Sequence, residues 1–173
     1  MTKTFLSLLT MLSFLSCKHS EYLPTVKKVN LEKYADTWYE IARLPNRFEK
    51  GLVCVTAKYT LKENGKIDVL NKGHLVENRE KIKEAKGVAW VPDPNYPGRL
   101  KVRFFWPFAG NYYIISLDEN YTWALIGDPS RKYLWILSKN KVLDDKIFNQ
   151  LVVKAKDQGF DIKKLIKIEQ SCE

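Results

Sequence analysis

The sequence is poor in the residues on which most catalysis and metal binding depend. Its 173 residues include two histidines, His19 and His74, and three cysteines. The patterns Gly-x-Ser-x-Gly, His-Glu-x-x-His and Cys-x-x-Cys are missing, as are the glycine-rich loops that hold phosphates. His74 is therefore interpreted as a surface residue. No metal and no cofactor are expected, because no cysteine lies near another cysteine or near His74.

Runs of basic residues are also missing, although Lys and Arg outnumber Asp and Glu by 29 to 20. The formal charge of +9 is compatible with nucleic acid or an anionic membrane as a partner. The distribution of the lysines along the sequence decides between such a partner and an ordinary solvated surface. They are scattered, without a basic run in which aromatic residues are interleaved. We expect a solvated outer surface and no nucleic-acid partner, with attraction to acidic lipid headgroups as the weaker alternative.

The single long apolar run stands at the start of the chain. Residues 1–16 carry one positive charge and are typical of a signal peptide, too short to span a bilayer. The run ends in Phe14-Leu15-Ser16-Cys17, which resembles a bacterial lipobox, whose cysteine is acylated. We expect a lipid anchor and tether at 17–28 and one domain at 29–173. Lys18 after Cys17 favours the outer membrane; an ordinary signal peptide with an incidental Cys17 is the alternative.

The two remaining cysteines, Cys54 and Cys172, lie far apart in the sequence. Export permits a disulfide between them. Closing so long a loop would stabilise the fold by about 4 kcal/mol if the effect is taken as chain entropy. Two free thiols are the alternative.

Apolar residues alternate with polar ones from position 37 to 139, between turn-forming residues. The predicted strands are Thr37–Leu44, Val53–Lys62, Lys66–Leu75, Lys81–Val91, Arg99–Trp106, Tyr112–Leu117, Tyr121–Ile126 and Tyr133–Ser138. The spacing then becomes helical between an N-cap at Asp144 and an end at Gly159, and Leu165–Glu169 is expected to be extended. The sequence therefore predicts an all-β antiparallel up-and-down meander with one C-terminal amphipathic helix packed outside it.

Strand alternation predicts which side chains face the interior. Lys58 marks the wet face of its strand, so Ala57 points inward, and Ala85, Gly87 and Ala89 share one inward face. Small inward residues favour an eight-stranded barrel with room for a ligand over a filled one. The expected cavity residues are Glu40, Ala57, Asn71, Ala89, Phe104, Tyr113 and Trp135, although alternation alone does not decide between Tyr112 and Tyr113.

Glu40 is a special case, because alternation with Trp38 and Ala42 turns its carboxyl inward. A buried carboxyl needs a partner or a raised pKa. We expect it to bind a ligand headgroup or to pair with an inward tyrosine such as Tyr59.

These residues carry a family resemblance. Asp36-Thr37-Trp38-Tyr39-Glu40 resembles the Gly-x-Trp signature of lipocalins, and Tyr133-Leu134-Trp135-Ile136-Leu137 resembles a later block of that family. With Phe104-Phe105-Trp106-Pro107-Phe108, the likeness is greatest to the outer-membrane lipoprotein lipocalins of bacteria and to the apolipoprotein D-like lipocalins.

The resemblance implies an up-and-down β-barrel of eight strands that is closed at the Trp38 end and holds a fatty acid or lysophospholipid. It also implies an acyl anchor at Cys17, a disulfide between Cys54 and Cys172, and lipid storage or transport for envelope maintenance. Some members are dimers, so a homodimer is one expected state. A lipocalin-like enzyme acting on a lipophilic substrate and a structural surface protein with a filled barrel are the alternatives.

Two residues at the closed end depart from the family pattern. Asp36 stands where the family has glycine, which would leave strain if that position needs a positive φ. Lys139 stands where the family has arginine and lacks its planar fork. We expect a looser closed end and an unchanged fold.

Overall fold

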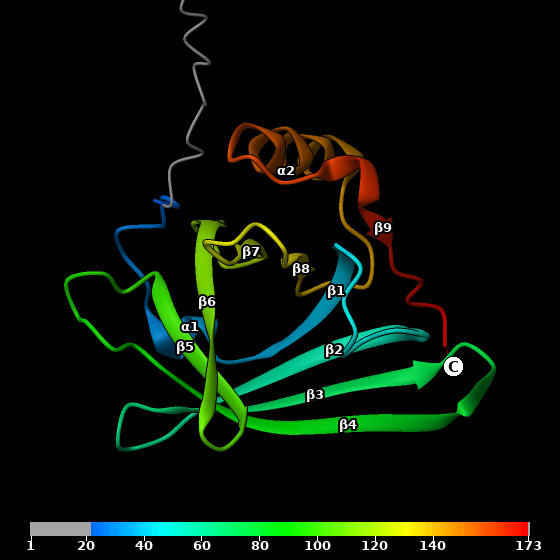
Figure 1. Ribbon diagram of the computed structural model, residues 1–173, viewed down its shortest axis with the longest axis horizontal. Coiled ribbons are helices and arrows are strands. Elements are labelled where there is room, and N and C mark those ends of the chain that lie inside the picture. Colours follow the sequence, from blue (N-terminus) through cyan, green and yellow to red (C-terminus); the bar gives the residue numbers. More distant parts are fainter. Residues whose placement is uncertain (1–21, 173) are drawn as a thin grey trace, which may run out of the picture.

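Nine strands form one continuous sheet in the computed structural model, which describes residues 22–172 (Figure 1). The strands are β1 (Thr37–Arg43), β2 (Leu52–Leu61), β3 (Ile67–Leu75), β4 (Asn78–Trp90), β5 (Arg99–Phe105), β6 (Phe108–Leu117), β7 (Trp123–Gly127), β8 (Leu134–Ser138) and β9 (Ile166–Lys167). The helices are α1 (Leu31–Tyr34) and α2 (Asp145–Asp157), and a 3-10 turn spans Ile162–Lys164. The expected signal peptide, Cys17 and the expected tether up to Glu21 lie outside the described residues.

The sheet closes into a barrel. Each of the strands β1 to β7 pairs with the next in antiparallel fashion, and β1 also pairs with β8. The predicted up-and-down meander of eight strands is confirmed. α2 packs outside the barrel, as the helical spacing indicated (Figure 1).

The C-terminal segment completes the wall where β1 and β2 separate. The first residues of β1, Thr37–Tyr39, pair with β2. The last residues of β1, Ala42 and Arg43, pair with β9. Gln170 spans the remaining gap, since its Nε2 donates to the carbonyls of Glu40 (2.7 Å) and Val55 (3.0 Å). Hydrogen bonds to both β1 and β2 thus hold the C-terminal residues between these two strands.

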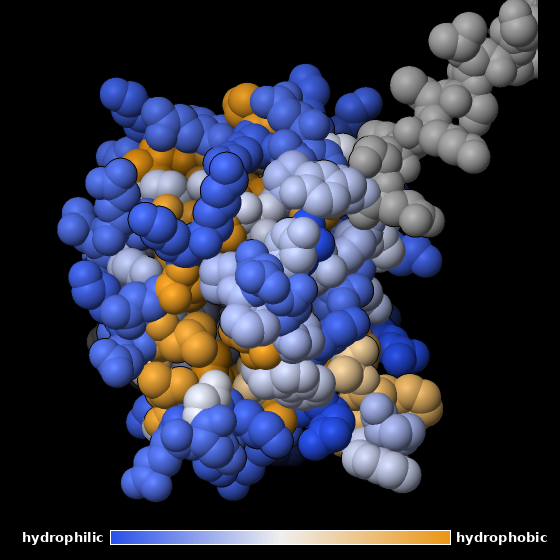
Figure 2. Space-filling model, turned by 90° about the vertical axis from the view of Figure 1, so that its left-hand side faces the viewer, coloured by the Kyte–Doolittle hydropathy of each residue, from blue (hydrophilic) through white to orange (hydrophobic). Residues whose placement is uncertain are grey.

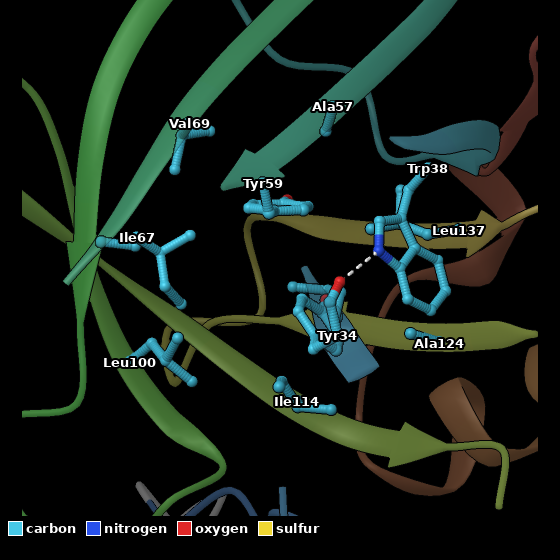
Figure 3. Close-up of a cluster of buried hydrophobic side chains, with 12 residues drawn as sticks. Tyr34, Trp38, Ala57, Tyr59, Ile67, Val69, Leu100, Ile114, Ala124 and Leu137 are labelled. Carbon is cyan, nitrogen blue, oxygen red and sulfur yellow. Dashed lines mark hydrogen bonds between the residues drawn. The ribbon is translucent and has the colours of Figure 1, made fainter. Parts of the chain in front are cut away.

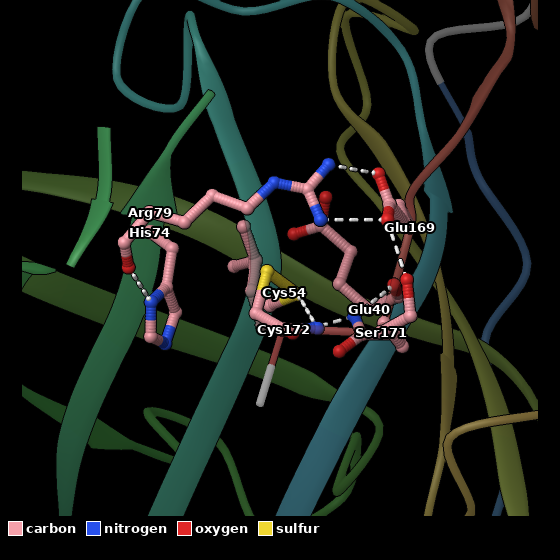
Figure 4. The surroundings of a disulfide bond; sticks show 9 residues. Glu40, Cys54, His74, Arg79, Glu169, Ser171 and Cys172 are labelled. Atoms are coloured by element: carbon pink, nitrogen blue, oxygen red, sulfur yellow. Dashed lines mark hydrogen bonds and ion pairs between the residues drawn. A yellow bond between two sulfur atoms is a disulfide. The ribbon is translucent and has the colours of Figure 1, made fainter. Parts of the chain in front are cut away.

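The expected disulfide joins this C-terminal segment to β2 (Figure 4). Cys54 and Cys172 are bonded, with their Cα atoms 6.0 Å apart. Beside them, the guanidinium of Arg79 on β4 donates to both carboxylate oxygens of Glu169 at 2.8 and 2.7 Å. The bidentate pair lowers the pKa of Glu169 to about 2.

A bulge in β1 overturns one part of the predicted alternation. The pairing with β8 shifts between Glu40 and Ala42. Ala42 therefore lies outside the barrel, among the residues under α2, and not inside as predicted. Arg43 is only 3% exposed and meets Glu40. An extra residue in a strand reverses the side-chain directions that follow it, which explains the error.

Two apolar clusters lie on the two faces of the sheet. The inner cluster fills much of the barrel around Trp38 and Tyr34. The outer cluster lies between the barrel and α2, which contributes Phe148, Leu151 and Ala155. Leu23 is buried in this outer cluster, so the described end of the expected tether lies against the barrel.

The helix boundaries follow the predicted capping residues. The Asp144 carboxylate accepts from the backbone N–H groups of Lys146 (2.9 Å) and Ile147 (3.1 Å). Gly159, just beyond the end of α2, has a φ of +85°. Both features satisfy backbone groups that a helix end leaves unpaired.

Hydrophilic side chains predominate on the face shown in Figure 2, with apolar atoms visible between them. This agrees with the scattered lysines of the sequence. No helix among residues 22–172 is both long and apolar enough to cross a membrane.

Candidate ligand cavity

A cavity of about 80 Å³ lies inside the barrel. Its apolar wall is formed by side chains from β2 to β5 and from β8, namely Val55, Ala57, Ile67, Val69, Ala89, Leu100, Val102, Phe104 and Leu137. Its polar atoms come from Tyr34, Glu40, Glu49, Tyr59, Asn71, Tyr112 and Trp135. The barrel is therefore hollow, as the small inward residues indicated.

Six of the seven expected cavity residues line this space: Glu40, Ala57, Asn71, Ala89, Phe104 and Trp135. Tyr113 does not. It packs with the outer cluster, while Tyr112 lines the cavity. The prediction of Tyr113 was wrong. The first residues of β6, Phe108–Asn111, were not predicted as strand, so the side-chain alternation along β6 had no fixed starting point.

Three tyrosine hydroxyl groups meet in the cavity wall. One hydrogen bond joins Tyr112 to Tyr34 (2.6 Å) and a second joins it to Tyr59 (3.0 Å). Burial raises the pKa of all three phenols, so they remain neutral. Tyr34 comes from α1, a four-residue helix that the strand pattern did not predict.

A cluster of two carboxyl groups and one guanidinium forms another polar part of the site. Arg43 Nη1 donates to Glu40 Oε1 at 2.5 Å, and Nη2 donates to the carbonyls of Glu49 (2.7 Å) and Leu52 (3.1 Å). The expected pairing of Glu40 with Tyr59 is therefore wrong, because the bulge in β1 supplies an arginine instead.

Glu49 belongs to the loop between β1 and β2. Its Oε2 accepts from Asn46 Nδ2 (2.6 Å) and from the indole Nε1 of Trp135 (3.0 Å). Sequence reasoning missed Glu49 because loop residues carry no alternation pattern. Its place beside Arg43 depends on how the loop folds back over the barrel.

The environment of Glu40 disfavours its charged form. The side chain is almost completely buried, and this burial is the main cause of its raised pKa. Repulsion from Glu49 raises the pKa further, and the attraction of Arg43 opposes both effects. Two carboxyl groups thus share one guanidinium.

The turn between β5 and β6 carries exposed apolar side chains. Phe105, Trp106 and Phe108 are 73%, 81% and 79% exposed. Phe104, the preceding residue, points inward and lines the cavity. An exposed aromatic hairpin therefore lies directly beside a residue of the cavity wall.

Trp38, at the start of β1, packs against Tyr34 in the inner cluster (Figure 3). Its side chain has no exposed surface, and its indole Nε1 donates to the Tyr34 carbonyl at 2.9 Å. The two rings lie 5.0 Å apart. α1 and β1 are thereby fixed to each other across the floor of the barrel.

Asp36 and Lys139, the two residues that depart from the family pattern, form an ion pair with each other. Lys139 Nζ lies 5.5 Å from the Trp38 ring centre and 2.9 Å from the Asp36 carboxylate. This contact lowers the pKa of Asp36. Asp36 is not among the described residues with positive φ, so the expected strain at this position is not present.

A metal site is not supported by the described part of the chain, in which no three His, Cys, Asp or Glu side chains are grouped to hold an ion. Cys54 and Cys172 are bonded to each other in the disulfide. The polar groups of the cavity are suited to hydrogen bonding.

Comparison with known proteins gives one consistent result. The sequence profile of a lipocalin-like domain matches residues 29–170. The chain is 40% identical over 151 residues to the outer membrane lipoprotein Blc of Vibrio cholerae, a match that covers 87% of this chain and 88% of the relative. It is 32% identical to apolipoprotein D of Macaca fascicularis, over 85% and 80% of the two chains.

Solved structures share the same architecture. Insecticyanin from the tobacco hornworm Manduca sexta superposes with a TM-score of 0.68 over 88% of this chain and 89% of its own, at 24% sequence identity. At that identity the likeness concerns the fold.

Proposed function

Because the chain belongs to the lipocalin family, we propose that it is a membrane-anchored binding protein that holds one single-chain lipid, a fatty acid or a lysophospholipid, in the barrel. The observation that carries the proposal is the cavity, whose wall is mainly apolar with polar groups confined to a few positions. Burial of an acyl chain there would supply most of the affinity, at about 25 cal/mol per Å² of apolar surface. The small volume favours a slender chain over a fused ring system.

The proposed location is the outer membrane. It rests on the lipobox-like Phe14-Leu15-Ser16-Cys17 and on relatives named outer membrane lipoprotein. An acyl chain on Cys17 would hold the barrel at a lipid surface, where storage or transport of lipids for envelope maintenance takes place. Incorporation of a labelled fatty acid tests the anchor, with Cys17→Ala as the unlabelled control. A homodimer is part of the proposal, and sedimentation of the purified protein tests it.

Binding can be tested by filling the cavity. Ala57 lines it, and a phenyl ring at this position would occupy much of the space. Lys58, the next residue on β2, is exposed and provides the matched control. Ala57→Phe should abolish binding of a fluorescent fatty-acid probe, while Lys58→Phe should leave it unchanged. Equal binding by both variants would place the ligand elsewhere.

The carboxyl pair also raises a catalytic alternative, since paired acids can act as acid and base. Arg43 holds Glu40 and the backbone of the Glu49 loop in place, which favours a structural and binding role. Turnover of a lipophilic substrate that disappears in Glu40→Gln, with ligand binding retained, would establish an enzyme instead.

A further inference from the structure

The polar atoms that the cavity offers to a ligand are mainly hydrogen-bond acceptors. Neither lysine, arginine nor histidine is among the lining residues. The Trp135 indole N–H is already donated to Glu49. Asn71 presents a buried Oδ1 that has no hydrogen-bond partner among the described residues. A buried acceptor without a donor is costly, so a ligand that brings a donor is favoured.

The tyrosines add little donor capacity. Three hydroxyl groups carry three hydrogens, and the two bonds among Tyr34, Tyr59 and Tyr112 use two of them. One hydrogen remains for a ligand or a water molecule. A single neutral donor does not replace the hydration of an ionised carboxylate.

The charged groups at the cavity also disfavour a carboxylate on the ligand. Arg43, the cation that contacts Glu40, does not itself line the cavity. Both of its terminal nitrogens already donate, to Glu40 and to two backbone carbonyls. Its buried Nε has no hydrogen-bond partner among the described residues and lies 3.9 Å from Glu49 Oε2. A carboxylate on the ligand would be the third acid beside this one guanidinium.

Resting on the proposed function, we infer that Glu40 and Glu49 determine headgroup specificity. They favour an acyl lipid whose first polar group donates a hydrogen bond or is positively charged, and they disfavour the carboxylate of a free fatty acid. The hydroxyl of an alcohol or monoglyceride, or an ammonium group, can donate to the Glu49 carboxylate and to Asn71 Oδ1. A fatty acid has to take up a proton before it enters.

The test compares four amphiphiles of one chain length: laurate, lauryl alcohol, monolaurin and laurylamine. Each displaces N-phenylnaphthylamine from the full mature chain at pH above the solution pKa of the acid. Lauryl alcohol, monolaurin and laurylamine should bind about tenfold or more tightly than laurate. Glu49→Gln should narrow this ratio and weaken laurylamine binding. Glu40→Gln should narrow the ratio less, because burial already disfavours the charged form of Glu40. Glu84→Gln removes an exposed carboxylate that pairs with Lys72 outside the barrel and should leave the ratio unchanged.

The outcomes separate the two proposals. If no amphiphile displaces the probe, the proposed function fails. If laurate binds wild-type protein as tightly as lauryl alcohol, or if both glutamine variants keep the wild-type ratio, the headgroup inference fails while lipid binding stands.

The pH dependence of the wild-type protein keeps the inference testable if a variant does not fold. The charged and titratable groups that face Glu40 are Arg43 on β1, Glu49 in the following loop and Tyr59 on β2. Laurate affinity should fall as pH rises, by about tenfold per unit above the solution pKa of the acid, because only the protonated form enters. Lauryl alcohol affinity should stay level over the same range. A laurate affinity that is independent of pH overturns the inference.

Discussion

Replacement of Trp38 by alanine tests how the closed end of the barrel is stabilised. The side chain is completely buried, its ring lies 5.0 Å from that of Tyr34, and its Nε1 donates to the Tyr34 carbonyl. Trp38→Ala removes this packing and leaves the carbonyl without its partner. α1 would then lose its main contact with β1.

The expected cost follows from these contacts. Truncation of a buried aromatic side chain to alanine costs about 3–5 kcal/mol. The unpaired carbonyl adds about 1 kcal/mol. A loss of roughly 4–6 kcal/mol is a large part of the stability of a domain, and it should lower Tm by roughly 10–20 °C.

Urea denaturation followed by far-ultraviolet circular dichroism measures the change, with the disulfide kept oxidised. Trp106 provides a control of the same residue type, because it is 81% exposed at the other end of the barrel. Trp106→Ala should change the free energy of unfolding by less than about 0.5 kcal/mol. A loss below about 1.5 kcal/mol for Trp38→Ala, or equal losses in the two variants, would refute this account of the closed end.

Three further predictions concern other parts of the fold. Replacing both Cys54 and Cys172 by serine should lower the free energy of unfolding by about 4–5 kcal/mol, because the disulfide closes a loop of 118 residues; reductant should destabilise the wild-type protein and leave the double variant unchanged. Asp144→Ala should cost about 1 kcal/mol through lost capping of α2, measured by thermal unfolding, whereas an unchanged Tm would contradict the cap. The free energy of unfolding of wild-type protein relative to Glu40→Gln should fall as pH rises from about 4.5 through the raised folded-state pKa of Glu40, because the folded protein keeps a proton that the unfolded chain releases. If this difference in the free energy of unfolding increases with pH in urea titrations, the folded-state pKa of Glu40 is lowered and the prediction is wrong.

Local patterns were sufficient to predict the strands, α2 and most of the cavity wall. Alternation places Ala57, Asn71 and Ala89 inside because β2, β3 and β4 keep their mutual register over these residues. Asp144 and Gly159 bound α2 because helix ends need partners that nearby residues can supply. The disulfide was predictable because two cysteines remained in a chain whose first residues are typical of a signal peptide.

The residues that were missed depend on long-range packing. Arg43 turns inward because of a bulge that no alternation pattern reveals. Glu49 enters the site from a loop, and Tyr34 enters from a helix of four residues. The pairing of Asp36 with Lys139 joins residues more than a hundred positions apart. Each residue, considered alone, was therefore interpreted as a departure that loosens the closed end.

The most direct test of the central claim is native mass spectrometry of the protein purified from its own membrane. The account predicts one single-chain lipid bound to each protein chain, present in wild type and Lys58→Phe and lost in Ala57→Phe. Wild-type protein that carries no lipid, or Ala57→Phe protein that carries as much as wild type, would contradict a ligand held in the barrel cavity.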